Sequence, residues 1–146
     1  MTICLRYTKN RDDAFEVLND GWLKVFKNIH RFDRSKASLY TWMRTIMINT
    51  AIDFLKRKQP VFDEMHDLGQ EEPAIENETI LKTDADELLS LIRKLPAATQ
   101  TVFTLFTVDG YTHKEIAARL GISEGTSKWH LFDARRQLKL LIKTNE

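Results

Sequence analysis

THKEIAARLGISEGTSKWHLFDARRQL, residues 112–138, is the stretch that decides the fold of the C-terminal part of the chain. Thr112 and Glu115 have the spacing of a capping box, which predicts that a helix begins here. Gly121 readily adopts the left-handed backbone conformation that ends such a helix, and Ser123 can cap a second one. Two short helices around a tight glycine turn predict a helix-turn-helix, and in DNA-binding examples the second helix enters the major groove.

The outward face of the predicted second helix indicates what it contacts. At about 100° per residue, one side is expected to be buried and carries Ser127, Leu131, Ala134 and Leu138. The opposite side carries Thr126, Trp129, Phe132, Asp133 and Arg136, flanked by Lys128, Arg135 and Lys139. Large exposed apolar groups usually mark contact sites, and cations and aromatic rings can contact phosphates and base edges. The pattern favours DNA binding; the alternative is that Trp129 and Phe132 pack on another helix of the chain.

The composition excludes several classes of protein. The 146 residues allow one domain or two small ones, and 42% hydrophobic residues with few Gly and Pro favour an all-α fold. Cys4 is the only cysteine, so an internal disulfide framework is excluded and a reducing compartment is indicated. The four histidines lack the spacing of zinc ligands, and we expect no metal and no cofactor.

Signals for membrane proteins and for enzymes are also missing from the sequence. It contains no run of about 18 apolar residues and no apolar signal-peptide segment near Met1. We therefore expect no membrane segment and a cytoplasmic location. We recognise no catalytic constellation and no phosphate-binding loop, so the chain is not expected to be an enzyme.

Charge is distributed in three blocks, although the net charge is only +1. Residues 1–58 hold 12 Lys/Arg and 6 Asp/Glu, residues 59–87 hold 1 and 10, and residues 88–146 hold 9 and 5. Two basic modules on either side of an acidic strip fit a protein that binds polyanions. Together with the loss of apolar periodicity, this predicts an N-terminal domain at 1–58, an acidic linker at 59–84 and a C-terminal domain at 85–146.

The N-terminal block contains two long predicted helices. The first has a helical apolar pattern from Asp12 or Asp13 to about residue 30. Gly21 lies within it, where glycine costs about 1 kcal/mol relative to alanine, and it either allows a close approach or is a tolerated defect. A basic connection, RFDRSKASL, then leads to a predicted helix over 39–58 that Ser38 can cap.

Trp42 lies in the polar strip of the predicted 39–58 helix. This strip spans about 80° and also holds Thr45, Asn49, Asp53 and Lys56. A tryptophan in such a strip suggests a stacking platform for a nucleic-acid base. Periodicity supports equally well a Trp42 that folds onto the preceding helix, and both interpretations stay open.

Taken together, these residues resemble the extracytoplasmic-function group of bacterial sigma-70 factors over essentially the whole chain. Region 4 is matched by Leu95-Pro96 and by the GYTHKEIAARLGISEGTSKWHLFDARRQL stretch. Region 2 is matched by DDAFEVLNDGWLKVF, RFDRSKASLYTWMRTI and NTAIDFLKR. LGIS-x-GT also occurs in other helix-turn-helix regulators, so the specific signal is the occurrence of both blocks, in order, across an acidic linker.

The resemblance implies an RNA polymerase sigma factor that directs promoter-specific transcription initiation. Region 2 would melt and read the −10 element, and region 4 would read the −35 element. The implied polymerase-docking residues are Leu18, Asn19, Asp20 and Trp22. The implied −10 residues are Arg31, Arg34, Lys36, Ser38, Trp42, Arg44, Asn49, Asp53 and Arg57. The implied −35 residues are Thr112, His113, Ser123, Thr126, Lys128, Trp129, Phe132 and Arg136.

The implied partners are core RNA polymerase and promoter DNA, and the sequence leaves open whether an anti-sigma factor restrains the protein.

Three features depart from the family pattern. The first helix of region 2 is mostly absent, Ser127 replaces the usual Val or Ile, and Asp133 stands where a basic residue is common. Two alternative functions stay open: a sigma-like decoy that binds a regulator protein, and a helix-turn-helix transcriptional repressor.

Overall fold

The structure, a computed structural model, describes residues 1–58 and 84–145. The chain divides into two compact units, Met1–Gln59 and Pro60–Glu146. Every regular element in the described residues is helical, which confirms the predicted all-α fold. The acidic linker predicted at 59–84 lies, apart from its last residue, outside the described residues.

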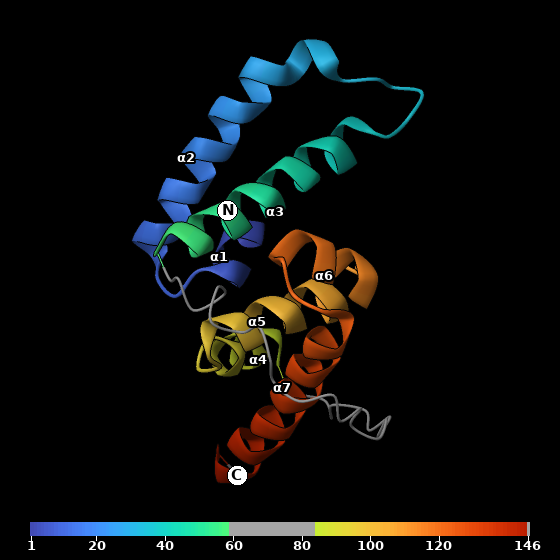
Figure 1. Ribbon diagram of the computed structural model, residues 1–146. Coiled ribbons are helices and arrows are strands. Elements are labelled where there is room, and N and C mark those ends of the chain that lie inside the picture. The colour runs from blue at the N-terminus through green and yellow to red at the C-terminus, as the bar shows by residue number, and fades with distance from the viewer. Residues whose placement is uncertain (59–83, 146) are drawn as a thin grey trace. The chain divides into compact units, whose positions relative to one another are not determined.

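Three helices and a short connection build the N-terminal unit. They are α1 (Thr2–Tyr7), α2 (Arg11–Asn28), the 3-10 turn η1 (Ile29–Arg31) and α3 (Leu39–Lys58). Figure 1 shows α2 and α3 as two long helices of opposite direction, joined at one end by the connection. α1 packs against both of them, and their shared core includes Val17, Ile48, Ala51 and Leu55.

Local capping explains where these helices begin. The Ser38 Oγ accepts a hydrogen bond from the Thr41 amide at 3.2 Å, which confirms the predicted cap and start of α3. The prediction that Asp12 or Asp13 opens α2 is wrong. Asn10 caps it, because its side-chain oxygen accepts from the Asp13 amide at 2.8 Å. The two aspartates instead occupy the first turn, where negative charge interacts favourably with the helix dipole.

Gly21 permits the close packing of α2 on α3. A Cβ atom added at this position would lie 2.2 Å from the Met47 Sδ, much closer than two non-bonded heavy atoms can approach. Met47 is itself buried on α3. Of the two interpretations of Gly21, the structure therefore supports close approach.

Four helices and a π-helical turn build the C-terminal unit. They are α4 (Ala85–Ile92), α5 (Ala97–Phe103), the π turn η3 (Thr104–Val108), α6 (His113–Leu120) and α7 (Glu124–Asn145). α7 packs against α4, α5 and α6. Its apolar contacts come from Leu131, Ala134 and Leu138, all buried as predicted.

The predicted helix-turn-helix is confirmed in its local details. Thr112 and Glu115 form the capping box reciprocally, with bonds of 3.2 and 2.8 Å between side chain and amide. Gly121 ends α6 at φ +69°, in the left-handed region that favours glycine. The Ser123 Oγ accepts from the Thr126 amide at 3.0 Å and so caps α7. Among the helices at residues 1–58 and 84–145, none combines the length and apolarity needed to cross a membrane.

Candidate nucleic-acid interface

A pocket of about 310 Å³ opens between the end of α2 and the first half of α3. The α3 residues that line it follow the helical spacing and lie on one face of α3. The other lining residues come from the end of α2 and from η1. The lining residues are Lys24, Asn28, Arg31, Trp42, Ile46, Asn49 and Thr50. Cations, amides and one large aromatic ring thus converge on a single concavity.

Trp42 takes part in this pocket and also contacts the connection. Its ring lies 5.5 Å from that of Phe32, centroid to centroid, with the planes tilted by 52°. The side chain is half-buried. Phe32 lies in the connection and not on α2, so this contact does not bear out a Trp42 that folds onto the preceding helix; the indole lines the pocket together with Lys24 and Asn28 of α2.

The basic connection is held in shape by Asp33. Its Oδ1 accepts from the amide and the hydroxyl of Ser35, at 2.9 and 2.6 Å. These two hydrogen bonds lower the pKa of the Asp33 carboxyl, because they stabilise its charged form. The resulting Asx turn leaves the side chains of Arg34 and Lys36 exposed to solvent.

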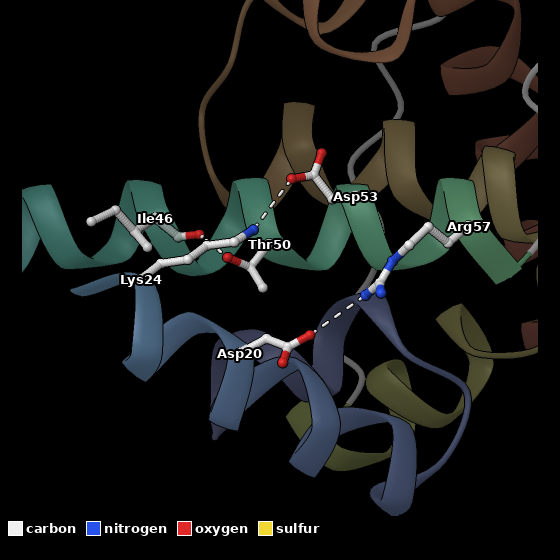
Figure 2. A network of polar contacts seen from close by, with 6 residues as sticks. All are labelled: Asp20, Lys24, Ile46, Thr50, Asp53 and Arg57. Atoms are coloured by element: carbon white, nitrogen blue, oxygen red, sulfur yellow. Dashed lines mark hydrogen bonds and ion pairs between the residues drawn. The ribbon is translucent and has the colours of Figure 1, made fainter. Parts of the chain in front are cut away.

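Ion pairs connect α2 and α3 outside the core. Lys24 Nζ lies 3.4 Å from Asp53 Oδ2, and Arg57 Nη2 lies 3.5 Å from Asp20 Oδ2 (Figure 2). Lys58 pairs with Asp13. Asp20, Asp53 and Arg57 were implicated in polymerase or DNA contacts by the resemblance, and the structure pairs each of them within the chain.

Part of the implied polymerase-docking set gathers at a second, smaller pocket. This pocket of about 120 Å³ includes Leu18 and Trp22 of α2 and Arg44 of α3 in its lining. Asn19 of α2 is exposed and Asp20 is half-buried. The neighbouring surface of α2 and η1 is unusually apolar for solvated helices, since Trp22, Leu23 and Phe26 of α2 and Ile29 of η1 are all exposed.

On α7, the predicted outward face is only partly correct. Phe132 is 41% exposed and Trp129 is half-buried, with its ring edge-on to His130 at 5.0 Å. Thr126 and Asp133, which were predicted to face outward, are buried. The buried face is wider than one helical stripe, because α7 contacts three helices at once.

Buried Asp133 is fully engaged by its own helix. Its two carboxylate oxygens accept from Arg136 Nη2 and from Gln137 Nε2, each at 2.6 Å. Arg136 Nε adds a third hydrogen bond at 3.2 Å. The negative charge of Asp133, which departs from the family pattern, is therefore compensated by hydrogen bonds within α7.

His113 connects the two helices of the helix-turn-helix. Its Nδ1 lies 2.8 Å from the Ser127 Oγ, and its ring stacks on Phe106 at a centroid distance of 4.5 Å. Burial, followed by the nearby charge of Lys128, lowers the pKa of this imidazole. Ser127 thus has a polar partner across the interface, which accounts for a hydroxyl at a position that is apolar in the family pattern.

Comparison with known proteins gives the family. The model of sigma-70 region 2 matches residues 1–61, and the model of sigma-70 region 4 matches residues 85–138. The chain belongs to the extracytoplasmic-function group of sigma-70 factors. It is a transcription initiation factor that works with RNA polymerase on promoter DNA.

Three curated relatives support this assignment. The sigma factor is 27% identical to the extracytoplasmic-function sigma-E factor of Haemophilus influenzae, over 89% of this chain and 75% of that protein. It is 31% identical to the sigma factor RpoE of Cereibacter sphaeroides, over 79% of this chain and 64% of that protein. It is 29% identical to SigV of Bacillus subtilis, over 94% of this chain and 81% of that protein.

A solved structure shows the same fold. This sigma factor superposes on RpoE of Bartonella quintana, solved in complex with the anti-sigma factor NepR, with a TM-score of 0.62 and 20% identity. The match covers 99% of this chain and 90% of that one. At this identity, the likeness establishes the all-α fold and nothing finer.

Some residues of the α2–α3 pocket of the sigma factor were predicted from the sequence, and others were not. Three of the implied −10 residues, Arg31, Trp42 and Asn49, lie together in its lining. Lys24, Asn28, Ile46 and Thr50 were missed. They have no local motif, and only the packing of α2 on α3 brings them to the same concavity. In the described part of the chain, no group of three or more His, Cys, Asp or Glu side chains is arranged to hold a metal.

Proposed function

We propose that this sigma factor captures a base of the melted −10 element in the α2–α3 pocket and reads the −35 element with α7. The α2–α3 pocket is the observation that carries the proposal. Its lining combines an aromatic ring, two asparagine amides and two cations, and contains no acidic side chain. An aromatic face stacks a base, amides bond to base edges, and cations neutralise phosphates.

The size and surroundings of this pocket support capture of a single nucleotide. Its volume of about 310 Å³ is at the lower end of the roughly 300–1,000 Å³ typical of small-molecule sites. Removing a base from the stack costs a few kcal/mol, which contacts in the pocket must offset. We propose that Arg34, Lys36 and Ser38 of the connection contact the backbone of the strand that delivers the base.

For the −35 element, we propose that Trp129, Phe132 and Lys128 contact bases. Exposure of Phe132 and partial exposure of Trp129 support this role. Thr112, His113 and Arg136 would lie near phosphates, and Ser123 and Thr126 would act through the cap at the start of α7. The bond from Arg136 to Asp133 implies that its phosphate contact is weaker than that of a free arginine.

For polymerase, we propose docking on α2 through Leu18, Asn19, Asp20 and Trp22. The exposed apolar surface around Trp22 supports a protein partner here. We also propose an anti-sigma factor as a partner, since the Bartonella quintana sigma factor was solved with one. These roles require binding and positioning, so we propose that the chain is not an enzyme and that it acts in the cytoplasm with RNA polymerase.

Reconstitution with core RNA polymerase tests the proposal. Run-off transcription on fragmented genomic DNA should give discrete new start sites that share −10 and −35 motifs. Polymerase binding without transcripts would contradict promoter reading by this chain. Promoter binding without any association with polymerase would instead favour a repressor.

Substitution of Trp42 tests the pocket itself. Trp42→Ala should reduce permanganate reactivity of the −10 thymines more than it reduces closed-complex binding, because stacking contributes about 1–3 kcal/mol per base. Phe15→Ala is the matched control, since Phe15 is an exposed aromatic of the same unit that lines neither pocket. Equal opening by the wild type and Trp42→Ala would remove the pocket from the mechanism.

Substitution of Trp129 tests the recognition face. Trp129→Ala should weaken −35 binding by about 1–3 kcal/mol on the best sequence and by less on variants at the contacted position. Lys139→Ala is a charge-changing comparison, and its effect should be the same on every sequence. An equal loss for Trp129→Ala across all −35 variants would reject base reading by this residue.

A further inference from the structure

Lys24 differs from the other cation of the α2–α3 pocket, because a carboxylate of the same unit holds it. It lies on α2 one turn before Asn28, and its Nζ reaches Asp53 Oδ2 at 3.4 Å. Figure 2 shows the amino group of Lys24 directed toward the carboxylate of Asp53 on α3. The ammonium group therefore sits at the edge of the pocket.

Asp53 itself lies outside the lining of the pocket. It follows Asn49 by four residues on α3, so it extends the pocket-lining face by one turn. A carboxylate at this place repels phosphate when it is unpaired, which is unfavourable for a nucleic-acid site. Its pairing with Lys24 resolves this conflict in the free protein.

The Lys24–Asp53 pair is of a kind that a phosphate can displace. The side chains are 46% and 63% exposed, so water and salt screen their attraction. The oxygens of a phosphate bound in the pocket compete directly with Asp53 Oδ2 for hydrogen bonds from the ammonium group of Lys24. The lysine side chain is long and flexible, and a small rotation suffices to transfer its contact.

We propose that Lys24 contacts a phosphate of single-stranded −10 DNA and that Asp53 is its positioning residue. In the free protein Asp53 neutralises Lys24 and lowers the affinity of the pocket for DNA in general. A strand whose base fills the pocket brings its phosphate to the ammonium and displaces Asp53. The inference rests on the proposed role of the α2–α3 pocket, and it gives Asp53 an action through Lys24 in place of direct DNA contact.

The chain supplies a matched control for this idea. Lys58 and Asp13 also form an ion pair between α3 and α2, but neither residue lines the pocket. Asp13→Asn therefore makes the same change of net charge as Asp53→Asn. It also releases a lysine from an ion pair between the same two helices. Any general effect of added positive charge on DNA binding appears in both variants.

The test measures binding of a short fluorescein-labelled single-stranded DNA to the reconstituted holoenzyme by anisotropy. The probe carries the −10 non-template sequence mapped by run-off, and a scrambled strand of the same composition serves for comparison. We expect Asp53→Asn to bind the scrambled strand roughly three- to tenfold more tightly, with a smaller gain on the −10 strand. Asp13→Asn should leave both affinities unchanged.

Salt dependence separates a phosphate contact from a structural role. Lys24→Met should reduce the slope of log affinity against log salt by about 0.7, the value for one phosphate contact on a single strand. Lys24→Arg should restore the slope. In a chain that already carries Lys24→Met, Asp53→Asn should give a clearly smaller gain than in the wild type, because no lysine remains to be released and only the repulsion by the unpaired carboxylate is removed.

Two outcomes would overturn the inference. One is an equal gain from Asp53→Asn with and without Lys24, which would make Asp53 a simple repulsive charge. The other is an unchanged salt slope in Lys24→Met while Trp42→Ala still weakens binding; the pocket then binds DNA without this contact. If Trp42→Ala and Lys24→Met both bind like the wild type, the proposed function of the pocket has failed instead.

Discussion

The buried imidazole of His130 predicts an acid-sensitive C-terminal unit. His130 lies on α7 with 3% of its surface exposed, and its Nδ1 is 3.0 Å from the Thr99 Oγ1 of α5. Burial lowers the pKa of His130 from 6.5 to about 4, only partly opposed by the charge of Asp133. The folded unit therefore keeps this ring neutral at pH values at which the unfolded chain protonates it.

The sign and size of the effect follow from linkage. Above its ordinary pKa of 6.5 the ring is neutral in both states and costs no stability. As the pH falls, the unfolded chain binds a proton that the folded one excludes, so the free energy of unfolding decreases until about pH 4. At 1.36 kcal/mol per pKa unit the full loss is about 3 kcal/mol, and about 2 kcal/mol of it is reached by pH 5.

Urea unfolding of the full chain measures this loss. Replacing Trp22 and Trp42 with phenylalanine leaves Trp129, next to His130, as the fluorescent reporter of the C-terminal unit. The free energy of unfolding should fall by about 2 kcal/mol between pH 7.5 and 5. His130→Gln should remove most of this slope, and His113→Gln should remove less because His113 is only half-buried.

Two results would refute the reasoning. The first is a His130→Gln variant that keeps the full pH dependence of the parent chain. The second is a His130 ring resonance that titrates near 6.5 in the folded protein by NMR. Either result would mean that the ring is solvated in the folded state.

Substitutions at three further positions test the packing and the caps, each by urea unfolding. Gly121→Ala should lower the free energy of unfolding by about 1 kcal/mol, because the native φ of +69° is unfavourable for any residue with a Cβ; no loss would mean that α6 can end in another way. Thr112→Ala should cost about 1 kcal/mol by removing the hydroxyl that accepts from the Glu115 amide, whereas Thr112→Ser should retain stability; equal loss in both would argue against the cap. Gly21→Ala should gain about 1 kcal/mol in helix propensity but lose about 1–3 kcal/mol by displacing Met47. A net stabilisation by Gly21→Ala would show that Met47 repacks freely.

Local signals made the helix-turn-helix predictable. The capping box at Thr112, the left-handed Gly121 and the Ser123 cap each act within a few residues of chain, and all three are present as predicted. The bounds of α3 were predicted for the same reason, since Ser38 caps its start. Hydrogen bonds that satisfy the free amides of a helix terminus depend little on the rest of the fold.

Predictions of which face is buried were less successful. Thr126 and Asp133 were placed outside by the helical period, yet both are buried because α7 contacts α4, α5 and α6 together. Asp133 tolerates burial because Arg136 and Gln137 bond to its carboxylate. The helical period of apolar residues identifies one buried stripe of a helix. It does not indicate how many neighbouring elements cover that helix.

The sequence alone determined the helical class and the helix-turn-helix, because each depends on residues close together in the chain, and it indicated the sigma family through two blocks of motifs in order along the chain. The tertiary structure decided which side chains share a site. Lys24 and Asn28 join Trp42 and Asn49 in one pocket only because α2 packs on α3, and Asp53 reaches Lys24 across 29 positions of sequence. Such convergence depends on the packing of two helices, and no local spacing encodes it.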